Sequence, residues 1–203
     1  MPRLFDPTQP ELMDRPQPVS EELKKDLENL VSLNKRFGSH RLLRHFLNRW
    51  IKPGSVCRVL DLATGAGDLP RAMVQWARSN RIQISVDAVD FQQSTLSIAQ
   101  SLSHGFPEIS WRCADIRSYE SAAPYDLVHC SLALHHFSEA DAINVLQRCN
   151  ALSRRWTLVS DLERSRFATS AIWLLTQFFY RDPMTRYDAR VSAKRAFSAK
   201  EMT

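Results

Sequence analysis

The clearest chemical signal in the sequence is the segment 59–68, which reads VLDLATGAGD. A hydrophobic, strand-like run ends near Asp61 and leads into a turn that contains Gly65 and Gly67. Glycines in such a turn let the backbone approach a ligand closely, and the helix expected next offers free N–H groups at its first turn. The segment therefore predicts a cofactor site between a strand and a helix.

The residues around this turn distinguish two classes of ligand. A dinucleotide fingerprint, G-x-G-x-x-G, needs a third glycine so that the helix packs closely on the strand, but Pro70 occupies that position. Asp61 places a carboxylate at the end of the strand, which suits a cationic or amino-bearing ligand better than a pyrophosphate. Because S-adenosylmethionine carries an α-amino group and a sulfonium, the turn favours this cofactor over a nicotinamide dinucleotide.

Five strand-like runs alternate with helical patterns along the middle of the chain. The runs cover 58–62, 82–90, 109–114, 125–131 and 155–161, and the helical patterns cover 69–77, 94–102, 140–152 and 166–180. This alternation predicts an α/β fold with a doubly wound, Rossmann-like, mostly parallel sheet and helices on both faces.

The first 52 residues differ from the rest. Residues 1–19 contain five prolines and predict an irregular arm. Ser20 is a candidate N-cap of a helix that Gly38 ends, and a second helical pattern covers 40–50. We therefore expect residues 1–52 to form an arm and a helical cap, and residues 53–203 to form the cofactor-binding domain.

The segment 61–67, DLATGAG, resembles the first motif of the class I S-adenosylmethionine-dependent methyltransferases, D-x-G-x-G-x-G. Ala63 stands where the first glycine is commonest, but alanine is usual in the similar quinone-biosynthesis type of small-molecule methyltransferase. The segments 114–116 (ADI), 126–131 (DLVHCS) and 134–137 (LHHF) resemble later motifs of the family. The resemblance covers about residues 53–165, with the motifs in the expected order.

The resemblance implies a role for each candidate residue. Asp90 would bind the ribose, Phe91 would stack on the adenine, and Asp115 would lie near the adenine amino group. The segment 11–14 (ELMD), followed by Asn34, Gly38 and Arg41, resembles the helical cap of some bacterial members, which closes over the methionine end of the cofactor. The remaining cofactor-binding candidates belong to the motifs themselves: Asp61, Ala63, Thr64, Gly65, Gly67, Ile116, Cys130 and Ser131.

His135 and Asp161 are the candidate catalytic residues. Histidine ordinarily titrates near neutral pH, so His135 and the adjacent His136 are candidate general bases, and Asp161 ends the last strand beside the expected acceptor. The alternative for the histidine pair is a structural role, with one ring hydrogen-bonded inside the fold.

The resemblance implies a methyltransferase that acts on a small, phenolic or quinone-like molecule by in-line transfer and releases S-adenosylhomocysteine. Two alternatives stay open: a nicotinamide-dependent oxidoreductase, and a non-catalytic S-adenosylmethionine-binding protein. The segment 129–132, HCSL, lacks the Asn/Asp-Pro-Pro-Tyr pattern of enzymes that methylate nucleic-acid amino groups. No constellation for a magnesium-dependent catechol methyltransferase is evident, so we expect no metal.

Composition excludes several other classes. Hydrophobic residues make up 44% of the 203 residues and charged residues 24%, as in ordinary globular domains. Residues 154–203 carry ten Lys and Arg against five Asp and Glu, whereas the numbers are equal in the rest, so the net charge of +5 comes from the tail. No nucleic-acid module, transmembrane run or secretory signal is recognisable, and the four isolated cysteines suggest a reducing, cytoplasmic location.

The C-terminal part lacks an element that the family normally has. The resemblance implies an antiparallel hairpin after the fifth helix, but no two strand-like runs follow Tyr180. We therefore expect an incomplete C-terminus and an exposed sheet edge, covered by the segments 171–179 or 190–197 or by a second chain in a homodimer. The polar segment 181–188 is expected to be exposed and to line the substrate cleft.

Overall fold

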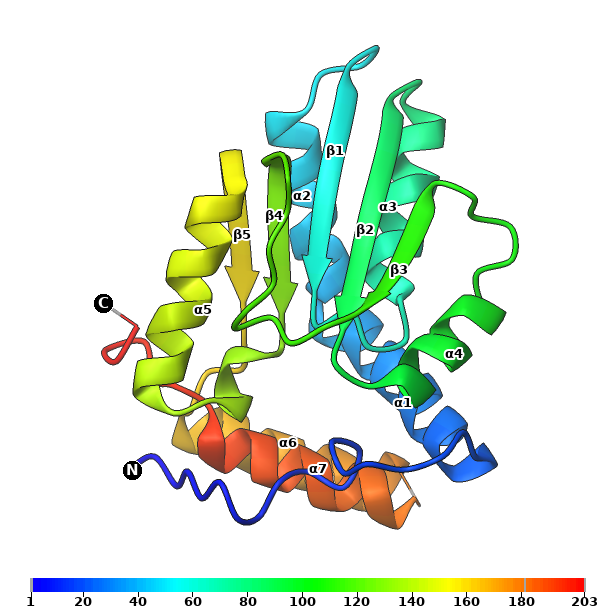
Figure 1. Cartoon of the computed structure of the whole chain (residues 1–203). Coiled ribbons are helices and arrows are strands. Elements are labelled where there is room, and N and C mark those ends of the chain that lie inside the picture. Colours follow the sequence, from blue (N-terminus) through cyan, green and yellow to red (C-terminus); the bar gives the residue numbers. More distant parts are fainter. Residues whose placement is uncertain (1, 181, 203) are drawn as a thin grey trace.

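The computed structural model describes residues 2–180 and 182–202, without the side chains of Arg166, Leu175 and Phe179. Five strands form one sheet in the order β3-β2-β1-β4-β5, and every pairing is parallel (Figure 1). The strands are β1 (Val56–Leu62), β2 (Gln83–Asp90), β3 (Ile109–Cys113), β4 (Tyr125–Ser131) and β5 (Ser153–Ser160). The direction of strand order reverses between β1 and β4, and ligands of such sheets bind outside the carboxyl ends at this point.

Helices cover both faces of the sheet, which confirms the predicted fold class. Cys57 and Val59 of β1 pack in a core with α2 (Ser39–Trp50) and α3 (Asp68–Ser79). Leu60 and Leu62 pack in the opposite core with α5 (Glu139–Leu152). α4 (Gln93–Ser101) lies beside β3. Burying each large apolar side chain contributes about 1.5–3 kcal/mol, and the two cores fix the sheet that positions the strand ends.

The N-terminal helices begin and end where the sequence predicts. The Leu23 N–H donates to the Ser20 hydroxyl at 3.1 Å, so Ser20 caps α1 (Glu21–Phe37). Gly38, with φ of 92°, ends α1 and precedes α2. Leu23 and Leu27 pack against Ala66 in the turn after β1, so α1 lies directly over the predicted cofactor site.

The C-terminal segments differ from the expectation. Of the segment 181–188, expected to be exposed, Arg181 lies outside the described residues, and the rest leads into α7 (Pro183–Arg195), which Asp182 caps. Pro183 and Tyr187 are exposed, but Thr185 and Asp188 are buried from solvent and line the cavity described below. These polar side chains are buried because both have hydrogen-bond partners in the N-terminal part. α6 (Arg166–Phe179) and α7 lie across the carboxyl ends of the strands (Figure 1), not along the sheet edge.

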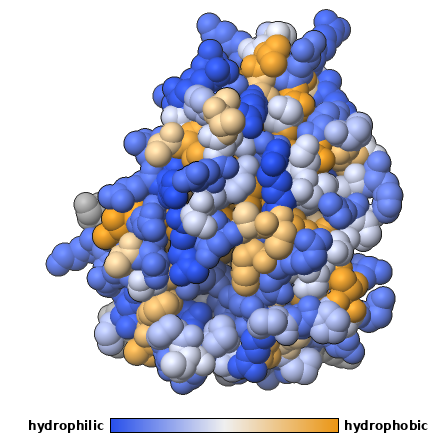
Figure 2. Space-filling model, viewed as in Figure 1, coloured by the Kyte–Doolittle hydropathy of each residue, from blue (hydrophilic) through white to orange (hydrophobic). Residues whose placement is uncertain are grey.

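β5 is one of the two outer strands of the sheet, beside β4, and the described residues contain no strand beyond the five. This agrees with the absence of a C-terminal hairpin from the sequence pattern. Pairing of two chains along β5 stays a prediction. Among the described helices, none has the length and hydrophobicity needed to cross a membrane. The face in Figure 2 is mainly hydrophilic, with small and separate hydrophobic areas.

Asp26 gives a test of how α1 and α7 are joined. Its carboxylate accepts a hydrogen bond from the Thr185 hydroxyl at 2.6 Å, and burial raises its pKa to about 6. In the unfolded chain the group deprotonates near pH 4, so its contribution to stability falls as pH rises from about 4 to about 6. We expect Asp26→Asn to flatten this fall, by at most about 3 kcal/mol.

Urea unfolding at a series of pH values measures the effect. The matched control is Glu28→Gln, which removes an exposed carboxylate from the middle of the same helix and should leave the pH dependence unchanged. Equal slopes for the wild-type protein and Asp26→Asn would contradict the assignment.

Candidate functional site

A cavity of about 950 Å³ lies at the carboxyl ends of the strands. Its lining includes the turn after β1, the ends of β2, β4 and β5, and residues of α1, α6, α7 and the N-terminal arm. The arm contributes because it is fixed to α7: the Asp188 carboxylate accepts from the backbone N–H groups of Leu12 and Met13, at 2.6 and 3.0 Å. Segments from both ends of the chain therefore close one cavity.

The turn after β1 has the open backbone that the sequence predicts. Ala63, Gly65 and Gly67 all have positive φ, of 56°, 52° and 68°. A Cβ atom on Gly65 would meet only the Leu30 side chain, at 3.9 Å, so the backbone at Gly65 is open toward the cavity. The same angle explains why glycine suits the Ala63 position, since alanine tolerates positive φ at a cost of about 1 kcal/mol.

Asp61 is held inside the protein at the start of this turn. Its two carboxylate oxygens lie 2.6 Å from the Thr64 hydroxyl and 2.5 Å from Nδ1 of His129 on β4. Asp61 and His129 are each 2% exposed. The carboxylate thus fixes the turn to two strands. Asp61 also lies in the cavity wall. Its direct contact with the cofactor's amino group stays a prediction.

The end of β2 contributes Asp90 and Phe91. The Asp90 carboxylate accepts from the Gly65 N–H at 2.9 Å and from the Gln92 N–H at 3.1 Å. Burial raises the pKa of Asp90, and these backbone donors partly oppose that effect. Phe91 is 55% exposed and lines the cavity, where a planar ligand group could stack on it. The ribose contact of Asp90 and the adenine contact of Phe91 stay predictions.

Only some of the candidate residues at the ends of β3 and β4 line the cavity. Asp115 and Ile116 line it, and an ion pair with Arg117, at 2.6 Å, lowers the pKa of Asp115. Ser131 lines it and lies 3.0 Å from the Ser160 hydroxyl. The Cys130 side chain instead packs in the core beside α5 and is 1% exposed. The thiol is therefore outside the cavity wall, and its predicted cofactor contact is not supported by its position.

The two candidate catalytic residues form a hydrogen-bonded pair. His135 lies in the short 3₁₀ helix η1 (Leu134–His136), and its Nδ1 is 2.6 Å from an Asp161 carboxylate oxygen. The other oxygen accepts from the His135 backbone N–H at 3.0 Å. Burial alone would raise the pKa of Asp161, but His135 and two backbone donors hold it below its usual value. Asp161 thus orients the ring and directs Nε2 away from β5.

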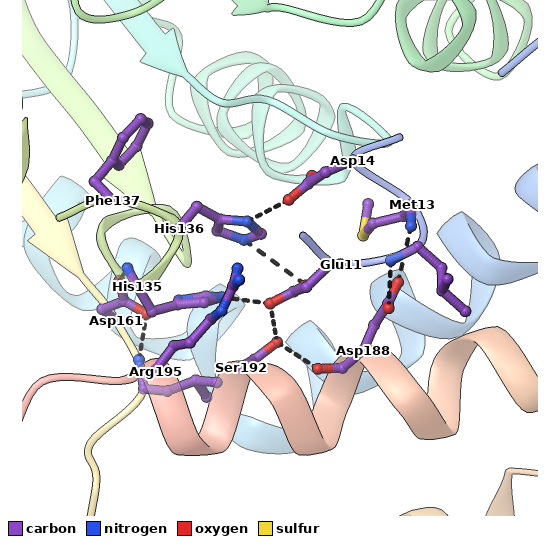
Figure 3. Close-up of polar contacts among 12 residues, drawn as sticks. Glu11, Met13, Asp14, His135, His136, Phe137, Asp161, Asp188, Ser192 and Arg195 are labelled. Atoms are coloured by element: carbon purple, nitrogen blue, oxygen red, sulfur yellow. Dashed lines mark hydrogen bonds and ion pairs between the residues drawn. The ribbon is translucent and has the colours of Figure 1, made fainter. Parts of the chain in front are cut away.

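Two acids of the N-terminal arm also reach the histidines, as Figure 3 shows. Asp14 lies 2.6 Å from Nδ1 of His136, and the Glu11 carboxylate faces Nε2 of both rings. Burial lowers the pKa of His136, but Glu11, Asp14 and Asp161 outweigh it and raise the pKa to about 10. Neither acid was a candidate site residue in the sequence analysis, although the segment 11–14 belongs to the part that resembles the helical cap of some family members.

Arg41 lines the cavity from α2, on the side of α1 and Gly38. Its predicted role at the methionine end of a cofactor stays a prediction. Nearby, Asp68 at the start of α3 lies 2.7 Å from Nε2 of His40 and within 3.4 Å of the Asn34 amide. These contacts join α1 and α2 to the helix that follows the glycine turn.

Gly67 gives a test of the turn that needs no ligand. A Cβ atom there would lie 2.5 Å from Cη2 and 2.9 Å from Cζ3 of the Trp111 ring, and φ is 68°. We expect Gly67→Ala to lower the free energy of unfolding by about 1–3 kcal/mol, through overpacking and the positive φ. Gly54→Ala, which has positive φ but nothing within 4 Å, is the matched control for the strain alone. Equal losses for the two variants in urea unfolding would contradict the Trp111 contact.

Comparison with known proteins supports a methyltransferase fold. Residues 59–155 match a family model described as a methyltransferase domain. A methyltransferase-like structure from Methanococcus maripaludis, named as putative and S-adenosylmethionine-dependent, has a TM-score of 0.55 and 17% identity over 80% of this chain and 75% of that chain. Comparison with curated proteins gives no match.

Two further solved structures have similar folds. A putative O-methyltransferase from Nostoc punctiforme has a TM-score of 0.55 and 16% identity over 85% of this chain and 51% of that chain. Magnesium protoporphyrin IX methyltransferase from Synechocystis, with bound S-adenosylhomocysteine, has a TM-score of 0.52 and 15% identity over 89% of this chain and 69% of that chain.

The chain spans only part of several such proteins, and covers 34% of the length of a coclaurine N-methyltransferase. The matched segment begins within β1 and includes the glycine turn, the ends of β2, β3 and β4, and the histidine pair. Residues 59–155 are therefore similar to a methyltransferase domain, and the chain shares the fold of these solved methyltransferase structures.

Proposed function

We propose that this chain transfers a methyl group from S-adenosylmethionine to a small molecule. The observation that supports the proposal is that one cavity contains both the glycine turn with Asp90 and, on another part of its wall, the His135–Asp161 pair. A cofactor and an acceptor could therefore lie in contact. The cavity volume of about 950 Å³ is at the upper end of the ~300–1,000 Å³ typical of small-molecule sites.

The described residues fit the proposed cofactor. Gly65 leaves the backbone open, Asp90 places a buried carboxylate beside it, and Phe91 offers an exposed ring. S-adenosylmethionine, when bound, supplies an electrophilic methyl group on a sulfonium. Since the reactive group belongs to the cofactor, the main tasks of the protein are to position the acceptor and to exclude water. α6, α7 and the arm provide the enclosing wall.

His135 can assist a phenolic acceptor. With Asp161 accepting the hydrogen from Nδ1, the neutral ring carries its lone pair on Nε2. We infer that Nε2 accepts the proton of the acceptor hydroxyl while the oxygen forms its bond to the methyl group, and that Asp161 stabilises the charged imidazole. An acceptor that is already nucleophilic, such as an amine, would need only positioning. We therefore propose a small-molecule acceptor in general, and a phenolic or quinone-like acceptor as the narrower alternative.

The family match favours methyl transfer over the nicotinamide-dependent alternative, since residues 59–155 match a methyltransferase domain and Pro70 disrupts the dinucleotide fingerprint. A non-catalytic S-adenosylmethionine-binding protein would have the same turn and the same Asp90. Only a transfer measurement separates this alternative from the proposed enzyme. Incubation with cofactor labelled on its methyl group and a panel of small phenols, quinols and amines should yield a labelled product. Tight cofactor binding with no transfer to any of them would favour the non-catalytic alternative.

Cofactor binding gives the more direct prediction. We expect S-adenosylhomocysteine to bind in calorimetric titration and NAD not to bind. Asp90→Ala should weaken binding by roughly 1–3 kcal/mol, the scale of a lost hydrogen bond to a charged group. Gly65→Val should abolish binding, because its side chain would block the open backbone at φ of 52°.

Glu120→Gln, at an exposed carboxylate that does not line the cavity, is the control and should bind like the wild-type protein. Unchanged affinity of Asp90→Ala would remove Asp90 from the site. Normal folding and binding of Gly65→Val would refute the assignment of the turn.

A further inference from the structure

We propose that Glu11, His135 and His136 form a binding site for one divalent transition-metal ion of the zinc or iron type. Their potential ligand atoms all lie within 4.8 Å of one another among the described residues. Glu11 and His135 are buried, and the His136 side chain is 21% exposed. The proposal does not depend on methyl transfer, because it concerns the binding of the ion alone.

The orientation of the two rings is the first argument. Each Nδ1 lies 2.6 Å from a carboxylate of its own, Asp161 for His135 and Asp14 for His136 (Figure 3). A carboxylate at this distance fixes a hydrogen on Nδ1, so a metal ion that displaces the proton from Nε2 would bind the lone pair of that nitrogen. Histidine ligands of metal ions commonly have this arrangement, in which an outer carboxylate sets the tautomer and increases the basicity of the ligating nitrogen.

The distances to Glu11 are the second argument. Nε2 of His135 lies 3.6 Å from one carboxylate oxygen of Glu11, and Nε2 of His136 lies 3.9 Å from the other. Both exceed the ~2.7–3.2 Å of a hydrogen bond. Two ligands bound at ~2.1 Å to one ion are separated by ~3.0–3.4 Å, so modest side-chain movements would bring these atoms onto a shared ion.

The local charge is the third argument. Glu11, Asp14 and Asp161 surround the two rings, and a lone pair that faces a carboxylate is unfavourable unless a cation lies between them. The nearby Arg195 guanidinium donates to the backbone carbonyls of Asp6 and Gln9 rather than to these acids. Without a metal ion, protons supply this positive charge, but a proton on each Nε2 would be expected to draw that nitrogen within hydrogen-bond distance of Glu11, and 3.6 and 3.9 Å are both longer. A divalent ion fits the observed separations better.

Glu11 is also held in place from outside the cluster. The Ser192 hydroxyl of α7 donates to Glu11 at 2.6 Å, and Asp188 holds the backbone of the next two residues of the arm. Two imidazoles and one carboxylate suit zinc, iron or cobalt, whereas magnesium and calcium prefer oxygen ligands. The three groups line the cavity, so open coordination positions would face it. A bound ion and the proton of an acceptor would compete for the same lone pair of His135.

Cobalt binding tests the site without any activity measurement. The untagged full-length chain is stripped with a chelator and titrated with Co²⁺, and binding is followed by visible absorption and by equilibrium dialysis. We expect one Co²⁺ per chain, displaced by Zn²⁺. Glu11→Gln, His135→Ala and His136→Ala should each weaken binding at least about 100-fold. Asp14→Asn and Asp161→Asn, which alter the outer carboxylates, should weaken it about 10–100-fold.

Matched controls address adventitious binding. His104→Ala removes an exposed histidine and Cys113→Ser an exposed thiol, and neither should change the affinity. Circular dichroism checks that each variant is folded, and the partly exposed His136 provides a test if His135→Ala unfolds. Absence of a stoichiometric site in the wild-type protein would overturn the proposal. Binding that survives both Glu11→Gln and His136→Ala would also overturn it, whatever the outcome for S-adenosylhomocysteine.

Discussion

The hydrogen bonds of the buried Asp61 carboxylate are the interaction on which the rest of the site depends. A buried carboxylate is costly unless both oxygens have partners, and here Thr64 and His129 supply them. These contacts tie the turn after β1 to β4, across the point where the strand order reverses. Asp90 adds a second carboxylate bond to the same turn, from β2. Side chains of three strands, β1, β2 and β4, therefore hold the glycine-rich turn in its open conformation.

Much of the fold could be predicted because local patterns determine it. Apolar runs of strand length alternate with segments whose apolar residues have helical spacing. The N-cap at Ser20 and the helix end at Gly38 likewise depend on only a few neighbouring residues. The wrong expectation concerned residues 182–188, where polar residues suggested exposure. Thr185 and Asp188 are buried against Asp26 and the arm, which lie more than 150 residues away in sequence. No local pattern in the sequence indicates such a contact.

The absence of local signals for long-range contacts also explains which site residues could be predicted from the sequence. The turn residues, Asp90 and the His135–Asp161 pair follow strand ends, and parallel strands bring their carboxyl ends together. Glu11 and Asp14 belong to a proline-rich arm with no regular structure, so periodicity could not place them near the histidines, and the resemblance of the segment 11–14 to a helical cap implied only closure over the cofactor. Cys130 shows the converse: its position in a motif suggested the cavity, but the pleat of β4 directs its side chain into the core.

The contacts between the two ends of the chain have a consequence for the order of assembly. The bonds from Asp188 to the arm and from Arg195 to the Asp6 and Gln9 carbonyls join residues separated by more than 170 positions. During synthesis, the arm leaves the ribosome before α7, and its bonds to Asp188 and Arg195 cannot form until α7 is complete. Because contacts between distant residues form slowly, the sheet and its two cores can fold while the cavity is still open on this side. Closure of the site would then be among the last steps of folding, and its wall of arm and α7 the first part to open under mild denaturing conditions.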